Sequence, residues 1–154
     1  IIEALGVEGG EAIALTTSAI RAERSVANTI VPAANSEVRQ AALNRAVVEV
    51  ETSAKPPTMT AAVRDAETGK IYTDVSGKPH PILSKDLQKQ APNPSKEPWP
   101  PCNCAETKAA NQAVKDGAKL KNLEHHTVRT KTGQMAPPCR NCRETLKQST
   151  HVKN

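Results

Sequence analysis

Apolar residues recur with helical spacing in two segments near the start of the chain. Over residues 11–30, isoleucine and alanine return every seven positions, which predicts an amphipathic helix. A second helix is predicted after a cap at Asn35 or Ser36. Four apolar residues fall on one face of this second helix, namely Leu43, Ala46, Val47 and Val50.

The period of the pattern changes to two after the second helix. Residues 58–66 and 70–75 alternate and are separated by Glu67-Thr68-Gly69, so they predict a β-hairpin. Prolines then recur through residues 76–101 without any hydrophobic period. A stretch of this kind predicts a long loop that is either functional or disordered.

The last third of the chain returns to alternating elements. A helix is predicted from Ala105 to Gly117, followed by a strand over residues 120–132. Pro138 is expected to start a short helix that runs to about Lys147, and residues 150–152 could add a final strand. The order of elements predicts an α/β fold in which helices cover a mixed sheet.

Composition points to a small core and to anionic partners. The hydrophobic share is 37%, with no Phe, one Trp and one Tyr, so a metal cross-link or a bound partner would add needed stability. From Thr107 onward there are ten Lys or Arg against three Asp or Glu. This excess favours nucleic acid as a partner, although a solvated lysine face is an equal alternative.

No apolar run is long enough to span a membrane, and no signal segment opens the chain. Because it does not begin with Met, we expect it to be part of a longer protein.

The four cysteines lie in two pairs, each behind prolines. Cys139 and Cys142 are three residues apart at a predicted helix start, and Cys104 begins another helix. Helix starts favour the thiolate form, so two of them facing each other would create a soft-metal site. Three sulfur ligands leave a fourth position for water, as in catalytic zinc sites. Glu106 could move protons beside that position, or could simply be a solvated first-turn carboxylate.

Two segments carry a resemblance to a known family. Cys104-Ala105-Glu106 and Pro137-Pro138-Cys139-Arg140-Asn141-Cys142 resemble the zinc deaminase signature, in which His or Cys, one residue and Glu precede Pro-Cys-x-x-Cys. The chain is thus similar to the cytidine-deaminase-like superfamily. The loop "SGKPHPIL" is similar to the YwqJ-like deaminases at the C-terminal ends of bacterial polymorphic toxins. One departure is that the superfamily sheet usually continues beyond the second cysteine helix, whereas this chain stops at Asn154.

The resemblance implies a three-layer fold with a zinc site at two helix N-termini. It places the deaminase domain at residues 34–154, with residues 1–33 as a helical segment or the end of a carrier region. Cys104, Cys139 and Cys142 would bind Zn²⁺, and Glu106 would be the proton shuttle. The implied substrate contacts are Trp99, His80, Asn103, Ala105, Pro137 and Pro138. From the residues alone, Trp99 could equally stack on a base or anchor the proline loop, and His80 could contact phosphate or only solvent.

The function that this implies is hydrolytic deamination of a nucleobase, with cytosine favoured over adenine, in single-stranded or flipped-out DNA or RNA. The domain would be a toxin that is secreted, acts in the cytoplasm of a target cell and is inhibited by an acidic immunity protein. Basic residues expected to hold the nucleic acid backbone are Lys108, Lys115, Lys119, Lys121, Arg129, Lys131, Arg140, Arg143 and Lys147.

Two other functions are open on the sequence. One is deamination of a free nucleoside or nucleotide, which would not need the basic residues. The other is a non-catalytic zinc module that binds nucleic acid and uses Cys102 as a fourth thiolate, although C-x-C fits structural zinc spacing less well than C-x-x-C. A thioredoxin-like role for Cys139 and Cys142 lacks the expected strand and loop context.

Overall fold

A four-stranded mixed sheet with the strand order β2-β1-β3-β4 forms the centre of the fold. The computed structural model describes residues 33–153, so the helix predicted over residues 11–30 lies outside the described part. The strands are β1 (Met59–Asp65), β2 (Ile71–Val75), β3 (Leu123–Arg129) and β4 (Thr150–His151). β1 is antiparallel to both β2 and β3, and β3 is parallel to β4. The α/β class, the mixed sheet and the predicted hairpin are confirmed.

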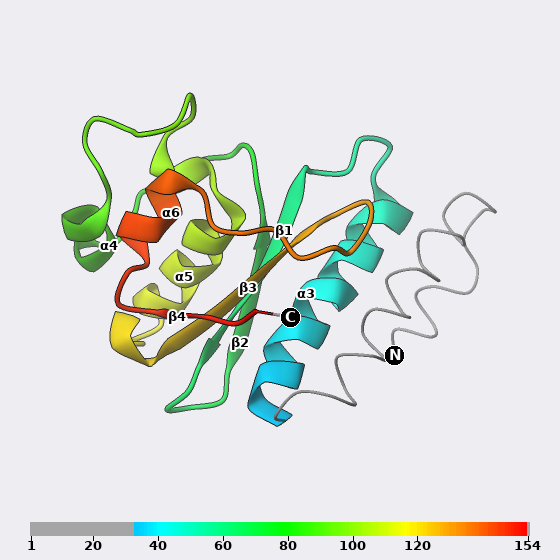
Figure 1. The fold of residues 1–154 in the computed structure, drawn as a ribbon, viewed down its shortest axis with the longest axis horizontal. Coiled ribbons are helices and arrows are strands. Elements are labelled where there is room, and N and C mark those ends of the chain that lie inside the picture. The colour runs from blue at the N-terminus through cyan, green and yellow to red at the C-terminus, as the bar shows by residue number, and fades with distance from the viewer. Residues whose placement is uncertain (1–32, 154) are drawn as a thin grey trace.

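Helix α3 (Ala33–Thr52) covers one face of the sheet. Figure 1 shows it on the opposite side of the strands from the other helices. Val38, Leu43 and Val47 are buried and pack with Ala62 of β1 and Val128 of β3. The helix begins at Ala33, before the predicted cap at Asn35 or Ser36, so the predicted start was three or four residues too late. Val50, predicted for the apolar face, is only half-buried.

Helix α5 (Ala105–Lys115) packs on the other face of the sheet. Its small residues Ala109 and Ala113 lie against Val63 of β1 and Leu123 of β3, which lets the helix approach the strands closely. Gly117 follows the helix with a φ of +103°, a conformation that a side chain disfavours. The predicted helix and its glycine stop are confirmed.

The proline-rich segment contains a short helix that the pattern did not predict. Helix α4 (Lys85–Gln90) is capped by Ser84, whose hydroxyl accepts a hydrogen bond from the N–H of Leu87 at 3.4 Å. Leu87 is fully buried and joins the core beneath α5. Six residues give fewer than two helical turns, so one buried leucine leaves no periodic signal.

The chain reverses after β3 and returns along it. A turn closed by the N–H of Gly133 to the carbonyl of Arg129 (2.8 Å) ends the strand earlier than the predicted Thr132. The N–H of Ala136 then donates to the carbonyl of Thr127 at 2.9 Å. Helix α6 (Arg140–Thr145) follows this returning segment and starts two residues later than the predicted start at Pro138. Within residues 33–153, no helix combines the length and apolar content needed to cross a bilayer.

Two adjacent histidines of β3 are buried on opposite faces of the sheet. The Nδ1 atom of His126 lies 2.7 Å from the carbonyl oxygen of Val152, so this nitrogen carries the donated proton. His125 stacks on His151, with ring centroids 5.2 Å apart. Burial lowers the pKa of His126 to about 4 and that of His125 to about 3.

We expect the stability of the fold to fall on acidification because of these two side chains. Both are neutral in the folded state but become charged in the unfolded chain below pH ~6.5, so stability present above that pH is lost as the pH falls toward the folded-state values. Each histidine contributes a slope of up to about 1.4 kcal/mol per pH unit. Urea unfolding between pH 7.5 and 5 should show a shallower decline for His126→Asn, which keeps a donor near Val152. An unchanged slope in that variant would contradict the assignment.

Candidate metal centre

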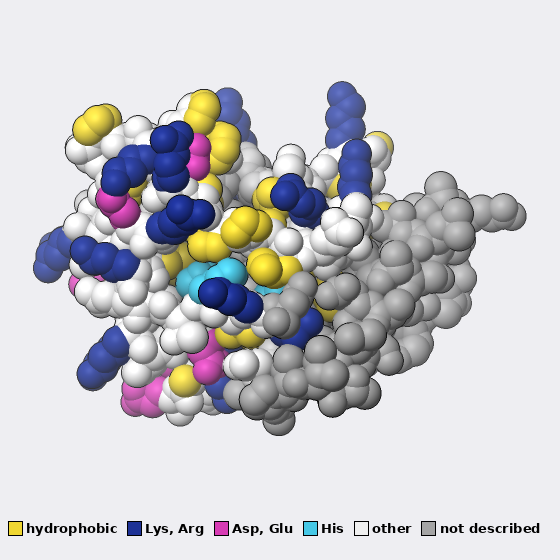
Figure 2. Space-filling view, viewed as in Figure 1, with side chains coloured by type: hydrophobic (Ala, Val, Ile, Leu, Met, Phe, Trp, Pro, Cys, Tyr) yellow, Lys and Arg dark blue, Asp and Glu magenta, His cyan; other side chains and the backbone are white. Residues whose placement is uncertain are grey.

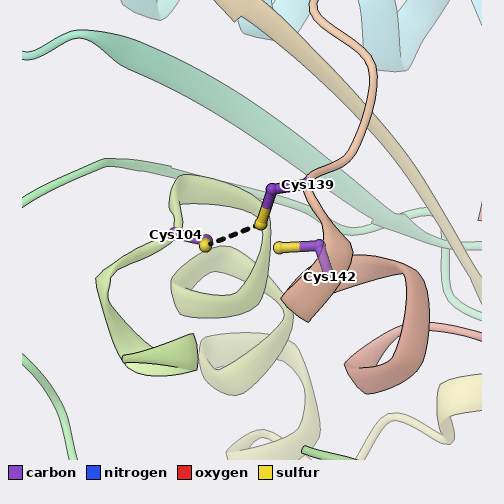
Figure 3. A group of neighbouring side chains, drawn as sticks. All are labelled: Cys104, Cys139 and Cys142. Carbon is purple, nitrogen blue, oxygen red and sulfur yellow. Dashed lines mark hydrogen bonds between the residues drawn. The ribbon is translucent and has the colours of Figure 1, made fainter. Parts of the chain in front are cut away.

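Three cysteines meet where two helices begin. Cys104 is the N-cap of α5 and follows a short 3-10 turn, η1 (Pro101–Asn103). Cys139 is the N-cap of α6, and Cys142 lies in the first turn of that helix. Figure 3 shows the three side chains pointing toward one another from these two helix starts. The three sulfurs therefore lie at two facing helix N-termini, as the sequence predicts.

The sulfur positions match those that a tetrahedral metal needs. The three Sγ atoms lie within 4.8 Å of one another, and those of Cys104 and Cys139 are 3.5 Å apart. Zinc–sulfur bonds of about 2.3 Å at tetrahedral angles place sulfurs roughly 3.8 Å apart. All four cysteines are free thiols, and 3.5 Å is far beyond the ~2.05 Å of a disulfide bond. The cluster could therefore hold a metal ion, and its thiol donors are compatible with zinc.

The protons of the cluster are shared unequally among the three sulfurs. The pKa of Cys139 is lowered, because its thiolate accepts hydrogen bonds from the thiols of Cys104 and Cys142 and from two backbone N–H groups of α6. The pKa of Cys104 is raised by the hydrogen bond that its thiol gives to Cys139, and that of Cys142 is raised by the same neighbours and by burial. Without a cation, the group thus favours one thiolate and two thiols. A divalent ion would displace the other two protons.

Glu106 lies beside the sulfurs in the first turn of α5. Its side chain is buried, and the carboxylate accepts a hydrogen bond from the hydroxyl of Thr127 at 3.0 Å. Burial raises the pKa of Glu106, and its own backbone N–H and the Thr127 hydroxyl oppose this shift in part. A buried carboxyl group within reach of a reacting proton can act as a general acid or base. The alternative of a solvated first-turn glutamate is therefore excluded.

A cavity of about 220 Å³ opens in front of the sulfurs and the carboxylate. Both Cys104 and Cys139 line it together with Glu106. Four residues predicted to contact substrate also line it, namely Trp99, Asn103, Ala105 and Pro137. Trp99 is 38% exposed, so this residue lines the cavity while still reaching solvent.

The other two predicted substrate contacts do not line this cavity. His80 is exposed, lines a separate hollow beside Lys108, and lies with its Nε2 atom 2.8 Å from the side-chain oxygen of Asn103. His80 therefore contacts Asn103, a residue that lines the cavity, from outside the cavity. Pro138 precedes the N-cap of α6 and is half-buried outside the lining.

Several residues that line the cavity were missed by the sequence patterns. They come from the ends and middle of strands and from the returning segment, namely Thr58, Met59, Ser76, Thr127 and Ala136. Thr127 has the clearest role, since it is the hydrogen-bond partner of Glu106. The available signal in the sequence was a polar residue, Thr127, within a predicted strand. Its partner could not be predicted, because the pairing depends on how α5 crosses the sheet.

Cys102 is not part of the sulfur group. Among residues 33–153, the candidate ligands that lie close enough to share a metal ion are Cys104, Cys139 and Cys142. Cys102 is half-buried in the η1 turn two residues earlier. The arrangement therefore does not support a closed site of four thiolates.

The basic residues of the last third are exposed, with one exception. Figure 2 shows Lys and Arg side chains spread around a hydrophobic and histidine-containing centre on one face. Lys108 is buried instead, and its ammonium group donates to the carbonyl of Gly77 at 2.9 Å and lies 3.6 Å from Asp74. Its predicted role as a nucleic acid contact is therefore wrong. Arg140 is exposed but already pairs with Glu97.

Comparison with known proteins does not assign this chain to a family. No protein-family model, no curated protein and no solved structure matches the chain. The function therefore has to be argued from the site itself.

Proposed function

We propose that this chain is a zinc-dependent hydrolytic deaminase of a nucleobase, with cytosine favoured, in single-stranded or flipped-out DNA or RNA. The observation that carries the proposal is one cavity lined by two sulfurs of a three-sulfur cluster and by a buried carboxylate. The helices on both faces of the mixed sheet, and the site at two helix starts, support the three-layer fold of the cytidine-deaminase-like superfamily. Only β4 follows α6 within the described residues, so the sheet would be a short form of that fold.

The cavity suits a small ring better than a whole nucleotide. Its volume of about 220 Å³ lies below the range of roughly 300–1,000 Å³ that holds drug-sized ligands. Trp99 at its wall offers an aromatic face on which a base can stack. A base can enter such a hollow only when it is unpaired, which is the reason for proposing single-stranded or flipped-out substrates.

The residues around the cavity divide the chemistry between them. Zinc held by Cys104, Cys139 and Cys142 would supply the Lewis acid that makes water a nucleophile at neutral pH. Glu106 would take the proton from the attacking water and deliver it to the ring nitrogen next to the reacting carbon. It would then pass a second proton to the departing amine, which leaves as ammonia. Thr127 fixes the carboxylate for both transfers, and the Pro137 carbonyl would accept a hydrogen bond from the amine.

The exposed basic residues favour a polymeric substrate over a free nucleoside. A nucleic acid held through its phosphates gives activity that falls steeply with salt, whereas deamination of free cytidine would show little salt dependence. The resemblance to toxin deaminases extends the proposal to a domain delivered into a target cell, with an acidic immunity protein covering the basic surface. The non-catalytic four-cysteine module is disfavoured, because Cys102 lies outside the sulfur group.

Replacing the carboxylate should abolish deamination while leaving the metal centre intact. We expect Glu106→Gln to lower turnover by about 100- to 10,000-fold, because proton transfer is lost while shape is kept. The measurement is sequencing of DNA and RNA from cells that express each protein. C-to-T changes in DNA, C-to-U changes in RNA, or the corresponding A-to-G changes would name the substrate. Glu67→Gln, at an exposed turn, is the matched control. Equal numbers of changes with Glu106→Gln and the unaltered protein would refute the assigned role.

Zinc should bind at one ion per chain and stabilise the fold. Zinc at 100 times its dissociation constant would add about 2.7 kcal/mol to the free energy of unfolding. Single serine replacements of Cys104, Cys139 or Cys142 should lose bound metal and most of this gain. Cys102→Ser should keep both, because its sulfur lies outside the cluster. Metal analysis and thermal unfolding with and without a chelator check the expectation. Loss of zinc on Cys102→Ser would instead favour the four-thiolate module.

A further inference from the structure

The side chain between the two cysteines of α6 holds the loop that carries Trp99. Asn141 is fully buried, and its side-chain oxygen accepts a hydrogen bond from the N–H of Lys96 at 2.8 Å. Its amide nitrogen donates to the hydroxyl of Ser95 at 2.9 Å and to the carbonyl of Trp99 at 3.1 Å. One side chain of the C-x-x-C segment thus fixes both ends of loop 95–99.

The neighbouring residue, Arg140, binds the middle of the same loop. The backbone N–H of Arg140 donates to one carboxylate oxygen of Glu97 at 3.0 Å, and its guanidinium donates to the other at 3.2 Å. The hydroxyl of Ser95 also donates to the carbonyl of Trp99 at 2.6 Å, which closes the loop on itself. Loop 95–99 is therefore a compact unit attached to the first turn of α6.

The first turn of α6 is also where two of the three sulfurs lie. Cys139 precedes Arg140 and Cys142 follows Asn141, so the two cysteines flank the two residues that contact the loop. A shift of this turn would move the sulfurs and break the three hydrogen bonds of Asn141 together. Such short-range contacts are lost within a few tenths of an ångström of displacement.

We propose that Asn141 is a positioning residue that couples occupation of the metal centre to the position of Trp99 in the cavity wall. Metal bound to Cys104, Cys139 and Cys142 fixes the first turn of α6 against α5, and Asn141 transmits this to loop 95–99. The stacking wall is then fully formed only in the metal-loaded protein. The inference rests on the metal centre of the proposed function but not on the base that is deaminated.

The single tryptophan of the chain makes this coupling measurable without any substrate. Zinc added to the reduced, metal-free protein should change Trp99 emission until one equivalent is bound, and should decrease quenching by acrylamide. Asn141→Ala should still bind metal but lose this response. Its quenching should be about twofold higher, since the ring moves from 38% exposure toward full exposure. Cobalt(II) absorption from cobalt–thiolate bonds reports metal binding separately in each protein.

Two exposed residues of the loop provide matched variants. Ser95→Ala removes one partner of Asn141 from an exposed position and should lose part of the response without affecting the core. It tests the same contact should Asn141→Ala fail to fold. Lys96→Ala removes only the exposed ion pair with Glu144 and keeps the backbone N–H that Asn141 accepts, so it should respond like the unaltered protein.

The outcomes separate the inference from the proposed function. Full cobalt–thiolate absorption with unchanged Trp99 emission would overturn the coupling but leave the metal centre standing. A response of Asn141→Ala equal to that of the unaltered protein would also overturn it. Absence of cobalt–thiolate absorption would overturn both the metal centre and the coupling. In turnover assays, Asn141→Ala should raise KM more than it lowers kcat, because Glu106 and the sulfurs are unchanged.

Discussion

The candidate metal centre brings together groups that would carry like charges in a largely buried environment. Three sulfurs and the carboxylate of Glu106 would all be anionic if fully ionised, and burial makes their mutual repulsion stronger than in water. Burial and hydrogen bonding disfavour the charged form of most of these groups, which raises the pKa of Cys104, Cys142 and Glu106. A divalent cation removes the conflict at the sulfurs, because its charge balances the thiolates. For a chain with a small aliphatic core, the free energy of binding such a cation would also contribute to folding.

The sheet brings the cluster together by bending the chain back along β3. The hydrogen bond from the N–H of Ala136 to the carbonyl of Thr127 holds the returning segment beside the strand, and the N-cap of α6, Cys139, follows three residues after Ala136. Thr127 thus has two roles, since its hydroxyl binds Glu106 while its carbonyl fixes the segment that carries two ligands. Helix α6 has only six residues, too few for intrinsic stability in isolation. Its position therefore depends on contacts with other parts of the chain, among them the hydrogen bonds of Asn141 to loop 95–99.

The features that could be predicted from sequence are those encoded locally. The pairing of β1 with β2 follows from the turn between two short segments, although β1 is buried at four consecutive positions and does not alternate. The alanine face of α5 follows from helical periodicity, and the sulfur cluster follows from short spacings at helix starts. Lys108 shows where such patterns fail, because a lysine in a basic stretch carries no sign that Gly77 and Asp74 bury it. The pairing of Thr127 with Glu106 depends on how α5 crosses the sheet. His80 likewise sits outside the cavity because the loop turns it toward Asn103.

Buried polar side chains of α5 and α6 hold the proline-rich segments in place. On α5, the ammonium group of Lys108 donates a hydrogen bond to the carbonyl of Gly77. The side chain of Asn111 accepts a hydrogen bond from the N–H of Ser84 and donates one to the carbonyl of Ile82. On α6, Asn141 holds loop 95–99 in the same manner. Prolines lack N–H groups and cannot join a ladder, so such segments need side-chain partners to be fixed. An unpaired buried amide or ammonium is costly, which ties each loop to one position. The two helices on which the sulfurs lie therefore also fix loops beside the cavity, so the geometry of the sulfurs and the shape of the cavity are linked.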